Sequence, residues 1–310
     1  MDDPCKRYYN LVKTASLKAA TTLAGSSPLR RIGIGVEVED FRKFAEGDDA
    51  RRIDWRITAR KPSPSGDYEL FVKEYRAERN LKPIVIVDAT ASMNFWNKAL
   101  TALYAASFIL NILSAFGDKP SLLLLSDKVE VFRNISADAL PYLLAKKLCE
   151  AEPKGGLTLT ECTQYVGLEK PIFVITDYAH SLDELKDFLR FIKASNTPTM
   201  FILVSAIEEK TDYGLANITF VDPEKGYFFT SKGSVFQKEV NLHVKTIKNI
   251  LSLHSIFVEI EGLKSFTAKS NKILLCIVKV REKLQNPGAN RKVVELILEL
   301  LDKKKNKKII

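Results

Sequence analysis

Short apolar segments alternate with longer amphipathic segments along most of the chain, from Lys82 onward. The short segments are nearly continuous in Val, Ile, Leu and Phe, which is typical of strands covered on both faces. The longer segments repeat apolar residues at spacings of three and four, as amphipathic helices do. This alternation predicts an α/β fold with a doubly wound, mostly parallel sheet. The expected strands are residues 83–87, 121–125, 171–176, 199–204 and 218–221, and the expected helices are residues 98–116, 137–150 and 182–195.

Toward the C-terminus the pattern becomes largely helical. Pro287 and Gly288 interrupt it, which predicts a break between the last two helices. A short strand is also expected to pair with the second of the strands above. The ranges are 128–132 for this short strand, 235–253 for a helix, 256–260 for an extended segment, and 271–284 and 290–301 for the two last helices.

The first 80 residues follow no simple period and are dense in charge, with glycine and proline as turn signals. A helix is expected within residues 2–23, and an extended segment at residues 68–75. We therefore expect three parts. They are a charged N-terminal extension at 1–80, an α/β domain at 81–262, and C-terminal helices with a basic tail at 263–310.

The composition is that of an ordinary globular protein, with 46% hydrophobic and 27% charged residues. The apolar runs are shorter than the ~20 residues that a membrane-spanning helix needs. Asp2, Asp3 and Pro4 stand where a secretory signal has basic and then apolar residues. These features predict a cytoplasmic protein without a transmembrane span.

The four cysteines are scattered and lack the Cys-x-x-Cys spacing of zinc sites, and they suggest no disulfide framework. Buried free thiols are expected at Cys5, Cys149, Cys162 and Cys276. Much of the net charge of +9 lies in the tail at residues 302–308, which reads DKKKNKK. Such a run is more often a solvated end than a binding device.

Three loops that follow expected strands carry small oxygen-bearing side chains, and ligands of open α/β sheets bind at the carboxyl ends of the strands. The first loop has an Asp-x-Thr-x-Ser arrangement, the second is rich in glycine and threonine, and the third is Thr-Asp. Each loop alone is more simply a turn or a helix cap. The three in this order predict one shared site, at Asp88, Thr90, Ser92, Thr158 and Asp177.

Oxygen ligands of this kind suit a hard cation, Mg²⁺ or Mn²⁺. We expect the hydroxyls of Thr90, Ser92 and Thr158 to coordinate directly, and Asp88 and Asp177 to hold bound water. Neutral ligands leave the ion electrophilic, with a position that a carboxylate of a partner protein can fill. The spacing does not match a phosphate-binding P-loop. A haloacid-dehalogenase site would need a second aspartate where Thr90 stands.

The N-terminal part carries a dense motif, which reads Gly33-x-Gly35-x-Glu37-x-x-Asp40-x-Arg42, then Gly47-Asp48-Asp49-x-Arg51-x-Ile53-Asp54-Trp55, Ala59-Arg60 and Leu70-x-Val72-Lys73-x-Tyr75-x-x-Glu78. With this motif the chain resembles the prokaryotic domain-of-unknown-function family fifty-eight. This resemblance implies a von Willebrand factor A-type (Rossmann-like) domain, a metal-ion-dependent adhesion site, and association with MoxR-type AAA+ ATPases in chaperone-like work. Two positions depart from the adhesion-site pattern. Thr90 replaces the usual Ser, and Leu157 replaces a usual Thr, so Thr158 or Thr160 must serve.

The acids of this motif alternate with arginines, which favours a salt-bridged structural network over general acid–base catalysis. Trp55 is expected to be a packing anchor of the same segment. His180 follows Asp177 closely enough either to line the site or to cap a loop. The expected structural residues are Glu37, Asp40, Arg42, Asp48, Asp49, Arg51, Asp54, Trp55 and Arg60.

The sequence therefore predicts a metal-dependent protein-binding module and not an enzyme, with a MoxR-type AAA+ ATPase as the expected partner. Two alternatives stay open. One is a magnesium-dependent phosphoesterase that uses Asp88 as nucleophile or ligand. The other is a binder of nucleic acid or of a membrane surface through the C-terminal lysines; of these, nucleic acid is not expected and peripheral membrane contact is kept.

Overall fold

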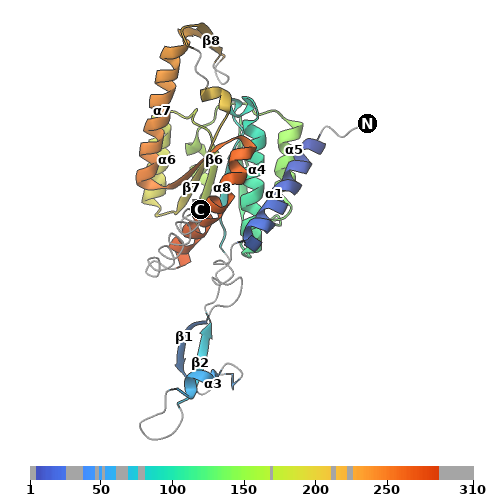
Figure 1. Cartoon of the computed structure of the whole chain (residues 1–310), viewed down its shortest axis with the longest axis vertical. Helices are drawn as coiled ribbons and strands as arrows, with labels where there is room; N and C mark the ends of the chain where they lie inside the picture. The colour runs from blue at the N-terminus through green and yellow to red at the C-terminus, as the bar shows by residue number, and fades with distance from the viewer. Residues whose placement is uncertain are drawn as a thin grey trace, which may run out of the picture. The chain divides into compact units, whose positions relative to one another are not determined.

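The computed structural model describes residues 5–25, 38–45, 49–50, 53–60, 69–75, 81–167, 170–210, 214–221 and 226–285. The chain forms two units, one of residues 26–79 and one of residues 1–25 together with 80–310 (Figure 1). Helix α1 (Lys6–Gly25) packs on α4 (Lys98–Ala115) of the larger unit. The smaller unit is therefore shorter than the N-terminal extension expected at 1–80.

A six-stranded sheet forms the centre of the larger unit, in the order β10-β7-β6-β3-β4-β5. Its neighbours pair in parallel except β4 and β5, which are antiparallel. The prediction of a mostly parallel α/β sheet is confirmed, and so is the pairing of the short strand with its predecessor. The strands are β3 (Ile84–Asp88), β4 (Ser121–Leu125), β5 (Val129–Phe132), β6 (Ile172–Thr176), β7 (Thr199–Ser205) and β10 (Ile256–Glu261).

Helices cover both faces of this sheet because alternate strand residues face opposite sides. On one side, Ile84 and Ile86 of β3 belong to an apolar cluster with residues of α6 (Leu182–Ala194) and α7 (Gly233–His254). The helices α4 and α8 (Gly262–Gln285) pack on the sheet from the other side, where the Phe108 and Phe266 rings meet edge to face at 5.2 Å. Helix α5 (Leu140–Glu150) packs beside α1 and α4.

Helix α4 is apolar and long enough, by length and composition, to cross a membrane. Within the described part of the chain it is the one helix of this kind, and 78% of its apolar stretch is buried inside the protein. Its flanks are covered by the sheet, α1, α5 and α8. It is thus the central core helix of the larger unit.

The prediction that residues 218–221 form a strand of the covered sheet is wrong. Strand β8 (Asn217–Val221) forms, but it pairs antiparallel with β9 (Phe228–Lys232) in a separate hairpin whose side chains are largely exposed. A run of four mostly apolar residues does not reveal which strand it will join. Helix α8 begins nine residues earlier than expected, at Gly262, and the helix expected at 290–301 lies outside the described residues.

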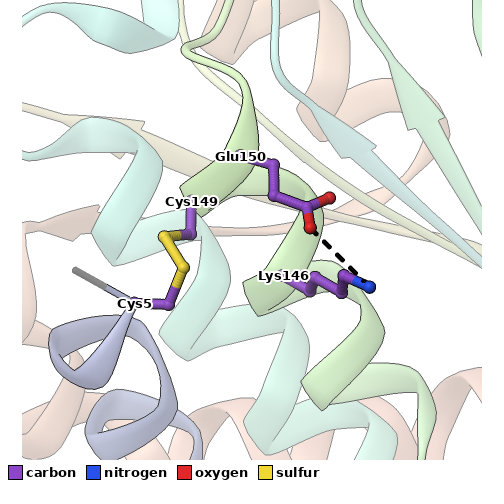
Figure 2. Close-up of a disulfide and its surroundings, with 4 residues drawn as sticks. All are labelled: Cys5, Lys146, Cys149 and Glu150. Carbon is purple, nitrogen blue, oxygen red and sulfur yellow. Dashed lines mark ion pairs between the residues drawn. A yellow bond between two sulfur atoms is a disulfide. The ribbon is translucent and has the colours of Figure 1, made fainter. Parts of the chain in front are cut away.

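Cysteine pairing differs from the expectation of four free thiols. Cys5 at the start of α1 and Cys149 in α5 form a disulfide, with their Cα atoms 5.5 Å apart (Figure 2). The two residues are 144 positions apart in sequence, so only the packing of α1 against α5 brings them together. Cys162 and Cys276 are buried free thiols, as predicted.

The smaller unit is built on strands β1 (Val38–Lys43) and β2 (Phe71–Tyr75), which pair antiparallel, and on the short helix α3 (Trp55–Thr58). The Asp54 carboxylate caps α3 by accepting from the backbone N–H groups of Arg56 and Ile57. The Trp55 side chain is 65% exposed, so it is not buried within this unit, and its role as a packing anchor stays a prediction. The salt-bridged network stays a prediction, because Glu37, Asp48 and Arg51 and the side chains of Asp40 and Arg42 lie outside the described residues.

Candidate functional site

The three predicted loops meet at the carboxyl edge of the sheet. Strands β3 and β6 are parallel neighbours, with Val87 opposite Ile175, although β4 and β5 lie between them in sequence. The chain thus leaves β3 in one direction and returns on its other side, and ligand sites of open α/β sheets lie at such a switch point. Asp88 closes β3 there, Thr176 closes β6, and Asp177 follows directly.

Backbone hydrogen bonds join the first and second loops. The Ala91 N–H donates to the Gly155 carbonyl (3.0 Å), and the Lys154 N–H donates to the Ala89 carbonyl (3.0 Å). Gly155 has φ +78°, and a Cβ there would lie 2.6 Å from backbone atoms of Asp127. A glycine is therefore required at this position, since any side chain would push the second loop away from the turn between β4 and β5.

Asp88 is the buried centre of the site, and both its carboxylate oxygens accept hydrogen bonds. Oδ1 accepts from the Thr90 N–H (2.9 Å) and hydroxyl (2.7 Å), and Oδ2 accepts from the Thr176 hydroxyl (2.6 Å) and lies 3.0 Å from His180 Nε2. Burial raises the pKa of this carboxyl, but the bonds to His180 and Thr176 outweigh burial and lower it. Asp88 is thus an ionised anchor that holds the first loop to the third.

The hydroxyls of the first loop lie side by side. Thr90 Oγ1 and Ser92 Oγ are 3.2 Å apart, and both residues are buried around the start of the 3₁₀ turn η2 (Ala91–Asn94). Thr158 precedes the 3₁₀ segment η3 (Leu159–Tyr165), is half-buried, and hydrogen-bonds through its hydroxyl to the Thr160 hydroxyl. The two candidates for the second-loop ligand are therefore paired with each other.

His180 lines the site, which resolves the alternatives left open by the sequence. Its Nε2 lies 2.7 Å from the Thr176 hydroxyl besides its contact with Asp88, and its Nδ1 lies 2.8 Å from Glu184 Oε1. Burial lowers the pKa of this imidazole, but the two carboxylates outweigh it and raise it well above the ordinary value. Glu184 also accepts from the Leu159 N–H (2.6 Å), so a protonated His180 links all three loops.

A second buried cation, Lys98, was not anticipated from the sequence. Its Nζ lies 2.7 Å from Asp177 Oδ2 and 2.7 Å from Glu209 Oε1, and the residue is 4% exposed. Burial lowers the pKa of this ammonium, but Asp177 and Glu209 together raise it. The signal available in the sequence was a lysine at the first position of an otherwise apolar helix; its partners stand 79 and 111 residues away.

The charge balance of this cluster leaves an excess of negative charge. Four carboxylates, those of Asp88, Asp177, Glu184 and Glu209, face the two cations His180 and Lys98. With all six groups charged, two negative charges stay uncompensated within the cluster. The buried cluster therefore attracts one further divalent cation or two single positive charges.

The stability of the protein is expected to depend on pH through the same cluster. Because the pKa of His180 is raised in the folded protein, the protonated imidazole stabilises the fold. This contribution to the free energy of unfolding is complete below the unfolded-state pKa near 6.5, and it is lost as pH rises through the folded-state pKa. Because the pKa of Asp88 is lowered in the folded protein, its carboxylate also contributes to the free energy of unfolding. This contribution is present above the unfolded-state pKa and is lost in acid, as pH falls through the folded-state pKa.

Urea unfolding between pH 3 and 10, with EDTA present, measures these contributions. We expect the free energy of unfolding to be greatest between about pH 4 and 6.5, with the alkaline decline flattened in His180→Gln. His243→Gln, whose imidazole contacts a backbone carbonyl at 2.9 Å, is the matched control. An unchanged alkaline decline in His180→Gln would contradict the assignment.

Comparison with known proteins gives one family and several distant relatives. A model of the family described as "Protein of unknown function DUF58" matches residues 40–234. Uncharacterized proteins of Mycobacterium bovis and Mycobacterium tuberculosis are 38% identical over 63 residues, which are 20% of this chain and 18% of each relative. The chain thus matches less than a fifth of the length of these relatives.

Two solved structures are similar in part. The conserved hypothetical protein BatB from Bacteroides thetaiotaomicron matches 64% of this chain and 99% of its own, with a TM-score of 0.40 and 16% identity. An aerotolerance-related membrane protein from Bacteroides fragilis matches 66% and 99%, with a TM-score of 0.40 and 11% identity.

Proposed function

This chain belongs to the DUF58 family of proteins of unknown function, and from that premise we propose that it is a protein-interaction module. It binds its partner at the carboxyl edge of the parallel sheet, with a divalent cation, Mg²⁺ or Mn²⁺, at the hydroxyls of Thr90 and Ser92. The observation that carries this proposal is the meeting of three loops around Asp88, with the two hydroxyls side by side. We propose further that the α/β unit is a von Willebrand factor A-type domain and that this cation site is its adhesion site.

The donor set fits such a cation. Octahedral Mg²⁺ has bonds of about 2.1 Å and so holds neighbouring ligands about 3 Å apart, and Thr90 Oγ1 and Ser92 Oγ lie 3.2 Å apart. Among the described residues no group of three or more His, Cys, Asp or Glu side chains is arranged to hold a metal. Hydroxyls would therefore have to be the direct ligands. When bound, the cation supplies an electrophilic position for a carboxylate of the partner.

The protein's own residues position this binding edge. The Asp88 carboxylate fixes the Thr90 hydroxyl by accepting its hydrogen bond, and His180 holds the third loop to Asp88. Lys98 donates to a carboxylate oxygen of Asp177, and His180 contacts one of Asp88; without these contacts the two oxygens could hold bound water. These two cations therefore compete with a metal for the same carboxylates, and they keep the loops assembled without one.

Exposed apolar side chains beside the site support a protein as the partner. Phe95 and Trp96 follow the first loop directly and are 45% and 59% exposed, and Ile207 follows β7 and is 66% exposed. Trp96 has φ +52°, an uncommon conformation for a bulky residue, which tertiary contacts must hold. Exposed aromatic residues next to a polar centre are typical of protein–protein interfaces.

The partner we propose is a MoxR-type AAA+ ATPase, with this chain as its adaptor in the cytoplasm; the support is the family membership and the binding edge. The geometry does not favour the phosphoesterase alternative, because a nucleophile must be reached by its substrate and Asp88 is 1% exposed. The lysines of the C-terminal tail lie outside the described residues, and membrane contact through them stays a prediction.

The test measures binding of the immobilised chain to a MoxR-type ATPase from the same organism, with Mg²⁺ present. We expect Thr90→Val to weaken binding at least about tenfold, or 1.4 kcal/mol, because valine keeps the shape but removes a ligand. Thr199→Val is the matched control, since Thr199 is also buried but lies at the amino end of β7. Equal binding by Thr90→Val and the control would overturn the metal-dependent mode, whereas no binding by the wild type would overturn the partner.

A further inference from the structure

A cationic cavity lies at the opposite edge of the same sheet. Its volume is about 810 Å³, within the range of small-molecule sites. The amino ends of β3, β4 and β6 open into it. The turn after β5 also reaches it, because β5 runs antiparallel to its neighbours and so ends at their amino edge. The cavity is therefore separate from the loops around Asp88.

Three lysines of this cavity come from one recurring dipeptide. A Lys-Pro pair stands directly before three neighbouring parallel strands: Lys82-Pro83 before β3, Lys119-Pro120 before β4, and Lys170-Pro171 before β6. Proline suits the first position of a strand, where it fixes φ and needs no ladder hydrogen bond. The pair thus places each lysine two residues before the first residue of a strand.

The register of the sheet aligns the three lysines in one row. Ile84 stands opposite both Ile172 and Ser121, and each of these is two residues beyond a lysine. The alignment continues into the Lys-Pro pairs, because the Ile84 N–H donates to the Pro171 carbonyl (2.9 Å) and the Ser121 N–H donates to the Pro83 carbonyl (2.9 Å). The row is Lys170, Lys82, Lys119, with strands about 4.8 Å apart.

Such a row of like charges opposes folding. Within the described part of the chain, no ion pair or side-chain hydrogen bond of Lys82, Lys119 or Lys170 is recorded, and no neighbouring carboxylate neutralises them. Of the described residues that line the cavity, Asp118 alone is acidic, and it is already bound by Arg281 through two contacts of 2.7 and 3.0 Å and accepts from the Leu81 N–H. As far as the described residues go, the three ammonium groups are therefore left for an external anion.

Further groups complete a concave anion site. Arg133 also lines the cavity, and its Nη2 donates to the Tyr165 carbonyl (2.9 Å), which fixes the guanidinium while leaving other N–H groups for a ligand. Ser136 and Gln164 add uncharged donors at the wall. A basic hollow of this size suits a small molecule better than a flat surface would.

We propose that this lysine row, Lys170, Lys82 and Lys119 with Arg133, is a binding site for a small polyanion that carries linked phosphate groups. A phosphate chain presents anionic oxygens along a line, as the row presents its ammonium groups, and ammonium and guanidinium groups both bind phosphate. Free polyphosphate and a nucleoside polyphosphate share this chemistry. The site does not depend on the function proposed for the carboxyl edge.

Calorimetry on the full chain at constant ionic strength tests this site, with inorganic tripolyphosphate, ATP without Mg²⁺, and citrate as probes. We expect saturable one-to-one binding of tripolyphosphate, and at least about tenfold weaker binding, or 1.4 kcal/mol, by the triple variant Lys82→Gln/Lys119→Gln/Lys170→Gln. Tighter binding of ATP than of tripolyphosphate would identify a nucleotide as the ligand, and equal or weaker binding would identify the phosphate chain. Citrate binding as tight as tripolyphosphate would overturn the phosphate assignment.

The matched control is Lys193→Gln/Lys245→Gln/Lys272→Gln, which removes the same charge from exposed positions on α6, α7 and α8. Equal weakening in both triple variants would overturn the site in favour of unspecific attraction to a basic protein. Urea unfolding without ligand gives a second readout, because removing the row should raise the unfolding midpoint relative to the control. If the triple variant unfolds, the single Lys119→Gln, compared with Lys193→Gln, decides the binding question.

Discussion

Replacing Lys98 with methionine is expected to lower the free energy of unfolding by about 3–5 kcal/mol, the usual cost of removing one partner of a buried ion pair. Lys98 is 4% exposed and lies 2.7 Å from carboxylate oxygens of both Asp177 and Glu209. Methionine has a similar length, so the change removes the charge and leaves Asp177, itself 3% exposed, without its counter-ion. Urea unfolding at pH 7 with EDTA measures the loss.

Two further variants separate charge from packing. Lys186→Met removes one partner of the exposed pair with Asp183 and should cost less than about 1 kcal/mol. The double variant Lys98→Met/Asp177→Asn should recover part of the stability, because it removes the uncompensated carboxylate. A loss in Lys98→Met no larger than in Lys186→Met would contradict the assignment of Lys98 as the counter-ion of the third loop.

The second large effect concerns the disulfide between α1 and α5. Cys5→Ser is expected to lower the free energy of unfolding by about 2–5 kcal/mol. The bond closes a loop with a sequence separation of 144 residues. A disulfide stabilises a protein more when it closes a longer loop, because it then removes more chain entropy from the unfolded state. Loss of the bond should also loosen α1, whose buried residues pack on α4.

Reduction of the wild type provides the control, since dithiothreitol should lower its stability to that of Cys5→Ser and leave the variant unchanged. Thiol counting on denatured protein should give two groups without reductant, Cys162 and Cys276, and four with it. Four thiols without reductant would contradict the bond. Counting on protein trapped directly from cells also bears on the proposed cytoplasmic location, because disulfides are rare in that compartment.

The sheet could be predicted from the sequence where a strand is buried on both faces. β3 and β6 are fully buried, and each reads as one short apolar run, so their positions were clear. β8 has a run of similar length, but its partner β9 and its exposed faces depend on tertiary placement that a local pattern does not contain. The disulfide was hidden for the same reason, because cysteine spacing says nothing about α1 lying beside α5.

The candidate site was predicted in part. Its loops were found because Asp88 and Asp177 follow strands whose carboxyl ends meet at one edge. The sequence assigns no role to Lys98 and leaves two open for His180, because a cation is matched to its carboxylates only after folding, here across 79 to 111 residues. The lysine row cannot be predicted although its Lys-Pro pairs are visible in the sequence, since only the strand register shows that they align.

The most direct test of the central proposal is calorimetric titration of the metal-free chain with Mn²⁺ and Mg²⁺, for the wild type, Thr90→Val, Ser92→Ala and the control Thr199→Val. The account predicts one saturable site in the wild type and in Thr199→Val, lost or weakened at least about tenfold in both hydroxyl variants. Binding that persists unchanged without either hydroxyl, or no binding by the wild type, would contradict a cation site at Thr90 and Ser92.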